Sequence, residues 1–338
     1  MHFEDIWPAG TDPGAALGVD FYEMTPRMVK RVTQKPAASV AVIGAGRLGQ
    51  AFAIALQSSG YSVVALVARR RQKAEKAAAL LRTTFIQYPG KTPELLVFGS
   101  NQLGELPDTD LVLITTPDDA IQDTAQRLSS SWNGRKGSTA LHTSGALSSE
   151  ALAPLAEKRF HTGSIHPLIS ISEPVSGAAA LHGAFFCIEG TGKAKRLAEA
   201  IVRDLGGHSF IIKPASKALY HAAAVMASPH LTALVDLAVE TLSACGLSKA
   251  RAQEVFMPLL ESTVNNLKTS NPQQALTGTF ARGDVATVRR HLDALSGKEL
   301  AEALEVYKLL GLHSLQLAEK NGLDAKLLTE IRKLLRSG

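Results

Sequence analysis

Cysteine is scarce in this sequence. The 338 residues include two cysteines, Cys187 and Cys245, which lie far apart and show neither metal-ligand nor redox spacing. Two neighbouring histidines, His161 and His166, also lack an acidic or cysteine partner at a fitting spacing. We therefore expect no metal ion, and the cysteine usage fits a reducing, cytoplasmic compartment.

Long apolar runs and a targeting segment are lacking as well. The chain has no uninterrupted run of about 18 or more apolar residues, so we expect no membrane span. Residues 1–8 carry two acids and no apolar stretch of the kind found in signal peptides. Residues 1–37 mix prolines with glycines, which predicts a partly ordered N-terminal extension.

Aromatic residues make up 5% of the chain, and no basic stripe with stacking side chains accompanies the net charge of +5. Lys and Arg are scattered along the sequence instead. These features argue against a nucleic-acid partner. The positive charge favours an anionic cofactor or a small anionic substrate.

The first motif with a specific chemistry reads Ser-Val-Ala-Val-Ile-Gly-Ala-Gly-Arg-Leu-Gly and ends at Gly49. A buried strand is predicted to break into a glycine turn and to continue as a helix. Gly44 permits the tight turn, Gly46 lets the backbone approach a pyrophosphate, and Gly49 lets the helix pack on the strand. With Arg47 and Leu48, the turn directs the free N–H groups of a helix N-terminus at an anion. The pattern predicts a dinucleotide site.

An acidic residue is missing where an NAD site has one. Such sites place Asp or Glu after the second strand, about 20 residues past the glycines, to bind the ribose hydroxyls. Arg69, Arg70 and Arg71 stand there instead. Two charge-assisted hydrogen bonds from guanidinium groups to a 2′-phosphate would favour NADP over NAD by roughly 3 kcal/mol. We expect Arg69 or Arg70 to take this role, while one of the three arginines belongs to a solvated helix face.

Strands and helices alternate from residue 39 onward, which predicts an α/β, Rossmann-like, doubly wound sheet. Ligands bind at the carboxyl ends of the strands in such sheets. Side chains expected at the nicotinamide end of the cleft are Thr116, Pro117, His142, Thr143 and Ser144. Turn chemistry alone is the alternative for these positions, since a proline followed by two aspartates also starts a helix.

Further strand-like runs at 162–169, 184–188 and 209–212 extend the sheet. The first of them contains His166. We interpret His166 as a hydrogen-bond donor that lines the site, and a satisfied core histidine is an equally weighted alternative.

The sequence changes character at residue 214, after which only helical patterns occur. Pro229 is expected to interrupt a long apolar segment at 215–244. A capping box of Ser296 and Glu299 is expected to start one of the later helices. We expect an NADP-binding Rossmann-like domain at 38–214 and an all-α substrate and dimerisation domain at 215–338.

Several segments together carry a family resemblance. Beside the glycine loop, the chain contains Thr-Thr-Pro-Asp-Asp, Leu-His-Thr-Ser-Gly-Ala, Ile-His-Pro-Leu, Lys-Ala-Leu-Tyr-His-Ala-Ala-Ala and Thr-Gly-Thr-Phe-Ala-Arg-Gly-Asp. They resemble a largely uncharacterised family of NADP oxidoreductases with a Rossmann-like domain followed by a helical domain of unknown function. The resemblance covers residues 38–295. More distantly, the chain is similar to pyrroline-5-carboxylate reductases and β-hydroxyacid dehydrogenases, which implies a dimer built through the C-terminal helices.

The similarity to β-hydroxyacid dehydrogenases bears on mechanism. In that family a lysine near the start of the long interdomain helix, with asparagines three and four positions on, supplies the proton donor and substrate contacts. This chain has Lys217, Tyr220 and His221 at those spacings, on one helix face. The resemblance implies acid and base roles for Lys217 and His221 and a substrate contact for Tyr220. The departure from asparagine argues against a hydroxyacid substrate.

Two alternatives accompany these assignments. Lys217 could be a solvated helix-start residue and His221 a buried structural one.

Arg282 stands next to a glycine at the mouth of a helix, and we expect it to hold a substrate carboxylate or phosphate.

The sequence thus predicts an NADPH-dependent reductase acting on a C=O or C=N carbon of a small, anionic metabolite, with His142, Ser144 and His166 lining the pocket. An alternative from another class is a dinucleotide-binding sensor or scaffold that has lost hydride transfer. A third is imine reduction of the pyrroline-carboxylate type, which depends less on a lysine acid.

Overall fold

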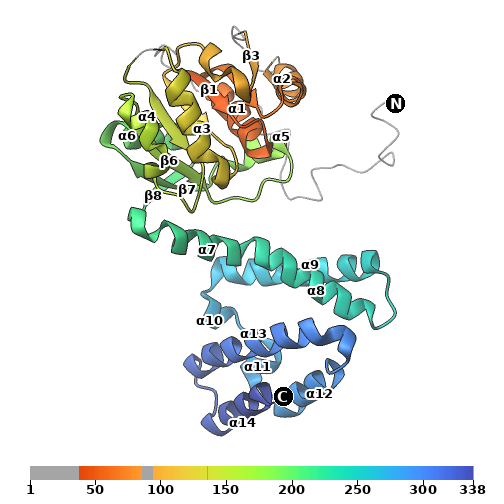
Figure 1. The fold of residues 1–338 in the computed structure, drawn as a ribbon. Helices are drawn as coiled ribbons and strands as arrows, with labels where there is room; N and C mark the ends of the chain where they lie inside the picture. The colour runs from red at the N-terminus through yellow and green to blue at the C-terminus, as the bar shows by residue number, and fades with distance from the viewer. Residues whose placement is uncertain (1–37, 86–93, 135, 338) are drawn as a thin grey trace. The chain divides into compact units, whose positions relative to one another are not determined.

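The structure is a computed structural model that describes residues 38–85, 94–134 and 136–337. The N-terminal extension expected at residues 1–37 lies outside the described residues. The chain forms two compact units, Met1–Ala224 and Val225–Gly338 (Figure 1).

An eight-stranded sheet organises the first unit, in the order β3-β2-β1-β4-β5-β6-β7-β8. Every neighbouring pair is parallel except β6 and β7. This architecture confirms the predicted Rossmann-like doubly wound sheet. The strands are β1 (Ser39–Ile43), β2 (Ser62–Ala68), β3 (Leu96–Gly99), β4 (Leu111–Ile114), β5 (Thr139–His142), β6 (His161–Pro167), β7 (Phe185–Gly190) and β8 (His208–Ile211).

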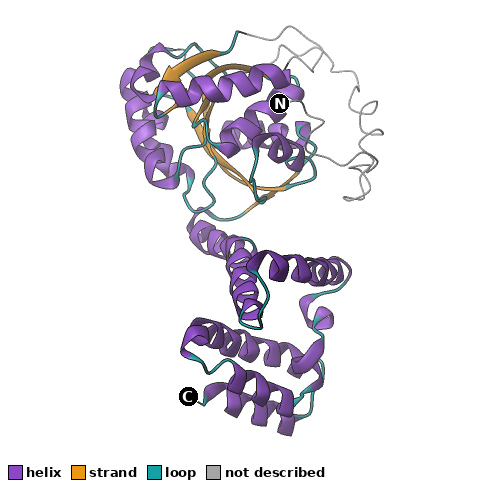
Figure 2. Ribbon diagram, turned by 90° about the vertical axis from the view of Figure 1, so that its right-hand side faces the viewer, coloured by secondary structure: helices purple, strands orange, loops and turns teal. Residues whose placement is uncertain are grey.

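Helices cover both faces of this sheet (Figure 2). Successive residues of β1 face opposite sides, so Val40 and Val42 join one apolar core while Ala41 and Ile43 join another. The first core includes side chains of α1, α2 and α6, and the second includes side chains of α3 and α4. The central strands β1 and β4 are almost wholly apolar because both of their faces are buried. The helical elements are α1 (Arg47–Ser58), α2 (Arg71–Phe85), η2 (Ser100–Glu105), α3 (Asp118–Ser131), η3 (Ser149–Leu152), α4 (Ala153–Glu157), α5 (Pro174–Ala180), α6 (Gly192–Asp204), η4 (Pro214–Ser216) and α7 (Lys217–Ala227).

The strand registers align the carboxyl ends that carry the site. Ile43 of β1 pairs with Val67 of β2 and with Ile114 of β4, and Ile114 pairs with His142 of β5. The residues that follow these four positions therefore gather at one edge of the sheet.

The second unit is helical throughout its described residues, which confirms the predicted all-α C-terminal region. A small core forms where Val288, Leu315 and Ile331 meet from three different helices. The helical elements are α8 (Pro229–Ser243), α9 (Lys249–Thr269), α10 (Pro272–Ala275), α11 (Gly278–Arg282), α12 (Val285–Ala294), η5 (Lys298–Leu300), α13 (Ala301–Lys320) and α14 (Ala325–Arg336).

Two predicted helix boundaries have different outcomes. The interruption at Pro229 is confirmed, because Ser228 leaves the helical conformation and Pro229 begins α8. The capping box of Ser296 and Glu299 is wrong. The Ser296 hydroxyl donates back to the carbonyl oxygen of Asp293 at 2.7 Å, and α13 begins only at Ala301.

Large apolar side chains of α8 and α9 remain exposed in this chain, including Leu231 at 44% and Leu259 at 61%. Within the described residues, the helical segment Pro214–Ser243 has the length and apolar composition that a membrane span needs. Core helices of soluble proteins pass the same criterion. The expectation of no membrane span therefore stays a prediction.

Candidate active site

The turn between β1 and α1 has the shape of an anion cradle. Gly44 has a φ of +122°, and a Cβ built on it would lie 2.6 Å from the carbonyl carbon of Thr115. Gly46 precedes α1 without any side-chain cap, and nothing lies within 4 Å of the place where its Cβ would be. The first turn of α1 also contains no acidic residue that would compete for its free N–H groups. A pyrophosphate fits such a helix N-terminus.

Gly49 serves packing in the same turn. A Cβ on Gly49 would collide with the carbonyl oxygen of Gly44 and the hydroxyl of Thr115. The partly buried Leu48 packs on the first core. Arg47 is exposed, and its guanidinium lies 3.4 Å from the carbonyl oxygen of Ser172. Arg47 is thus the side chain of this turn with access to an anion.

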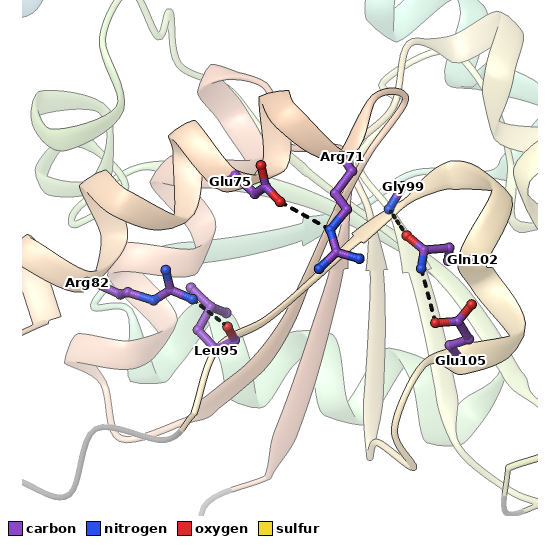
Figure 3. A network of polar contacts seen from close by, with 7 residues as sticks. All are labelled: Arg71, Glu75, Arg82, Leu95, Gly99, Gln102 and Glu105. Atoms are coloured by element: carbon purple, nitrogen blue, oxygen red, sulfur yellow. Dashed lines mark hydrogen bonds and ion pairs between the residues drawn. The ribbon is translucent and has the colours of Figure 1, made fainter.

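The three arginines after β2 have different surroundings. Arg71 donates to the Glu75 carboxylate at 3.1 Å, one turn along the exposed face of α2. Figure 3 shows Arg71 beside Gly99, whose N–H donates to Gln102 at 3.0 Å. Arg69 and Arg70 are exposed, and no hydrogen bond or ion pair joins their guanidinium groups to any residue that the structure describes. Arg69 and Arg70 therefore carry the free positive charge of this edge.

The end of β4 offers an orphaned polar atom. The Thr115 hydroxyl donates to the carbonyl oxygen of Gly44 at 2.7 Å, whereas the Thr116 hydroxyl is buried without a partner among the described residues. Pro117 is exposed and precedes α3. A buried hydroxyl without a partner costs free energy that a bound ligand can recover. Together with the glycine cradle, Thr116 fits the predicted dinucleotide.

The loop after β5 is held by its own side chains. The Ser144 hydroxyl donates to Asp118 at 2.7 Å and accepts the N–H groups of Ala146 and Leu147. His142 is fully buried, its Nδ1 accepts the Ser144 N–H at 3.2 Å, and its Nε2 lies 3.0 Å from the Ser148 carbonyl oxygen. Burial lowers the pKa of His142 to about 4. Both predicted pocket residues are therefore engaged in shaping this loop.

Lys217 begins α7 and is 1% exposed. Its Nζ donates to the backbone carbonyl oxygen of Ser144 at 3.0 Å and to the hydroxyl of Ser164 at 2.9 Å. Burial lowers the pKa of Lys217, although the nearby Cys187 and Glu189 oppose the shift. Lys217 is thus neither solvated nor open to a ligand; it joins α7 to the loop after β5 and to β6.

His166, Tyr220 and His221 form a cluster next to Lys217. Nδ1 of His166 shares a hydrogen bond of 2.7 Å with the Tyr220 hydroxyl. The rings of His166 and His221 meet edge to face, with centroids 5.7 Å apart. Nδ1 of His221 is buried and has no partner within the described part of the chain. Burial, followed by the charges of Lys217 and His221, lowers the pKa of His166 to about 4.

Four residues around this cluster are not among those predicted from the sequence: Asp118, Gly145, Ser164 and Glu189. Ser164 and His166 share one face of β6, because side chains alternate along a strand. That alternation was the available signal for Ser164. Glu189 accepts hydrogen bonds from the N–H and the hydroxyl of Ser149, and it pairs with Ser164 across the antiparallel β6 and β7. No local sequence pattern predicts the contact between Glu189 and Ser149.

Arg282 belongs to the second unit. It is exposed at the last position of α11 and is followed by Gly283, which has a φ of +67°. Its role toward a substrate stays a prediction. Within the described ranges, no three His, Cys, Asp or Glu side chains group as a metal site would need.

Comparison with known proteins identifies both halves of the chain. A Rossmann-like domain matches residues 24–167, and a domain of unknown function, DUF2520, matches residues 184–314. These matches confirm the resemblance inferred from the sequence motifs. A search among curated proteins returned no match.

Three solved structures share the fold. A putative NADP oxidoreductase from Bacteroides fragilis is 21% identical, with a TM-score of 0.66 over 83% of this chain and 98% of that one. A protein from Thermotoga maritima is 22% identical, with a TM-score of 0.61 over 83% of this chain and 99% of that one. The 1-pyrroline-5-carboxylate reductase from Streptococcus pyogenes is 15% identical, with a TM-score of 0.54 over 88% of this chain and all of that one.

Proposed function

We propose that this chain, in which a Rossmann-like domain match precedes a DUF2520 domain match, is an NADP(H)-dependent oxidoreductase. The observation that carries the proposal is the uncapped glycine turn of Gly44, Gly46 and Gly49, with Arg69 and Arg70 at the end of the neighbouring strand, where their guanidinium groups have no partner among the described residues. The first feature suits a pyrophosphate, and the second suits a 2′-phosphate. The names of the B. fragilis and S. pyogenes proteins agree with a reductase.

The cofactor contacts follow from this placement. We assign Gly44, Gly46, Arg47, Leu48 and Gly49 to the pyrophosphate, the last two through backbone and packing. Arg69 and Arg70 take the 2′-phosphate. We place Thr116, Pro117 and Ser144 at the nicotinamide end. The Thr116 hydroxyl there is buried and has no hydrogen-bond partner among the described residues. When bound, the cofactor supplies a hydride for the carbon of a C=O or C=N bond.

The protein has to supply a proton to the oxygen or nitrogen of that bond. His221 is our proposed donor, because its ring is partly exposed and its Nδ1 has no partner among the described residues. Lys217, the other predicted catalytic residue, is too buried for direct contact, so we assign it the positioning of Ser144 and Ser164. Its charge also adds to the burial that lowers the pKa of the neighbouring His166.

The substrate side is assigned to His166 and Tyr220, which share a hydrogen bond beside His221. His142 supports the pocket from behind, because both of its ring nitrogens are engaged. Arg282 remains our candidate for the anionic group of the substrate. A small C=O or C=N compound with a carboxylate or phosphate is the substrate class that these residues suit.

Two alternatives remain distinct from this proposal. A catalytically inactive dinucleotide-binding sensor or scaffold would bind the cofactor and turn nothing over. An imine reductase of the pyrroline-carboxylate type would reduce cyclic imines and depend little on Lys217.

The domain roles and the assembly are part of the same proposal. Residues 38–214 bind NADP, and residues 215–338 serve the substrate and a homodimer. Exposed apolar side chains on α8 and α9 support a second copy of the chain as the partner. A cytoplasmic location suits the exposed Cys245 and the absence of a disulfide between the chain's two cysteines.

The decisive experiment titrates the purified protein with NADPH and NADH and then tests turnover against small keto acids and cyclic imines. Tighter binding of NADPH with turnover of one compound supports the reductase. Binding without turnover of any compound favours the sensor. If neither nucleotide binds in the micromolar range, the oxidoreductase assignment is wrong.

A further inference from the structure

Gly145, which follows Ser144 in the loop after β5, lies against the rings of both His166 and His221. A methyl group built on Gly145 would be 2.5 Å from Nδ1 of His221 and 2.8 Å from Nε2 of His166. Non-bonded carbon and nitrogen atoms do not approach so closely at a stable contact. Any side chain at position 145 would therefore displace one of the two rings.

The backbone itself does not require glycine there. Gly145 is not among the residues with positive φ, so its conformation is one that other residues adopt. The neighbouring rings are the reason for its missing side chain. This separates Gly145 from Gly44, where the backbone conformation already favours glycine.

The two rings come from different elements and pack against each other. His166 stands on β6 and is held by the Tyr220 hydroxyl at 2.7 Å. His221 stands on the second turn of α7, and its ring meets the ring of His166 at 83°. Protein interiors are packed densely enough for one added methyl group to be felt.

One nitrogen of this arrangement is left without a hydrogen bond. Nδ1 of His221 is buried and unpartnered among the described residues, a state that costs free energy unless a ligand or a water completes it. Nε2 of His166 faces the same glycine, while its Nδ1 is already engaged with Tyr220.

We propose that Gly145 is a positioning residue: its missing side chain lets Nδ1 of His221 and Nε2 of His166 approach one polar atom of the substrate, the oxygen or nitrogen of the bond being reduced. The role of that atom rests on the proposed reductase function. The steric role of Gly145 toward the two rings does not, so the two parts are tested separately.

The steric part is tested by thermal unfolding of the full chain. Gly145→Ala is compared in the wild-type and His221→Ala backgrounds, and the loss in Tm is expected to fall by at least half when the His221 ring is absent. Gly192→Ala is the matched control, because its Cβ would meet only Arg196 at 3.5 Å. An equal loss in both backgrounds overturns the proposal.

Folding of the variants is itself informative. If Gly145→Ala does not fold, recovery of folding in the Gly145→Ala/His221→Ala double variant supports the steric role. Failure of the double variant while His221→Ala alone folds counts against it.

The substrate part is tested with NADPH, histidine ring NMR and the compound that the keto acid and imine panel identifies. Gly145→Ala is expected to shift the ring signals of His166 and His221 and to leave the NADPH Kd unchanged. The kcat should fall on the order of 10²-fold, since small displacements of reacting groups carry that cost. Unchanged ring signals, or a kcat equal to that of the wild type, overturn the positioning role. If the wild type binds no NADPH, the proposed function fails while the unfolding test still stands.

Discussion

Nζ of Lys217 donates a 3.0 Å hydrogen bond to the backbone carbonyl oxygen of Ser144. This contact joins the first residue of α7 to the loop after β5, and a second bond to Ser164 continues the link to β6. A lysine so placed fixes the geometry between the loop and the helix that carries His221. Its chemical role is therefore separable from that of His221.

Substitution of Lys217 by methionine tests this separation. Lys217→Met keeps the apolar stem and removes both hydrogen bonds, so we expect kcat to fall by no more than about tenfold, whereas His221→Gln should cost on the order of 10²-fold. Steady-state kinetics across a pH series provides the measurement. Ser164→Ala, which removes one acceptor of Lys217, is the control and should resemble Lys217→Met. A loss of 10²-fold or more in Lys217→Met, with a changed pH profile, would return the acid role to the lysine.

The proposed preference for NADPH is tested on Arg69 and Arg70. Arg69→Ala/Arg70→Ala removes the proposed 2′-phosphate contacts and is expected to weaken NADPH binding on the order of a hundredfold, with little change for NADH. Fluorescence titration with each nucleotide measures both affinities. Arg71→Ala serves as the control because Arg71 is paired with Glu75. Equal loss of both nucleotides, or no loss of either, would contradict the assignment.

Stability is expected to depend on pH through the buried histidines. The pKa values of His142 and His166 are lowered to about 4 in the folded protein, below the ordinary value of 6.5. The unfolded chain therefore binds protons before the folded one does, and stability is lost as pH falls from 6.5 toward 4. Between pH 7.5 and pH 5 the loss should reach about 2 kcal/mol for each histidine.

Urea unfolding at both pH values measures this loss. His166→Gln should remove about half of the pH dependence that the two histidines cause. His230→Gln is the control, because His230 is exposed on α8. A His166→Gln variant with the full wild-type pH dependence would show that His166 titrates normally in the folded protein.

The proposed homodimer is tested on α9. Leu259→Glu places a charge on an exposed apolar side chain, and if a second chain covers it, burial of that charge should disfavour assembly by several kcal/mol. Sedimentation of the wild type is expected to show a dimer, and the variant a monomer. Lys326→Glu on the exposed face of α14 is the charged control. A dimer that is unaffected in Leu259→Glu would place the interface elsewhere. A monomeric wild type would contradict the proposed homodimer.

Much of the fold could be predicted because its signals are local. Apolar runs mark β1 and β4, glycines mark the turn into α1, and Asp284 and Asp324 cap α12 and α14 through their carboxylates. The antiparallel pairing of β6 with β7 has no such local signal, since strand direction depends on the path of the whole chain. The capping box at Ser296 failed because its hydroxyl completes the end of α12 instead of starting the next helix.

The site could be predicted in part for the same reason. Helical spacing placed Lys217, Tyr220 and His221 on one face of one helix. The burial of Lys217 depends on acceptors from β6 and from the loop after β5, which lie 53 and 73 residues away in the sequence. Contacts between residues so far apart in the sequence follow from strand order and register, which a single sequence does not specify.

The break at Ser228 sets the length over which α7 is tied to the sheet. The helix holds Lys217, Tyr220 and His221 in its first two turns, and the chain leaves helical geometry only at Ser228 before continuing into α8. The contacts of Lys217 with Ser144 and Ser164, and of Tyr220 with His166, therefore all lie on the N-terminal side of the break. The anchoring of these side chains depends on the sheet and on the first turns of α7, and not on the helix that begins at Pro229.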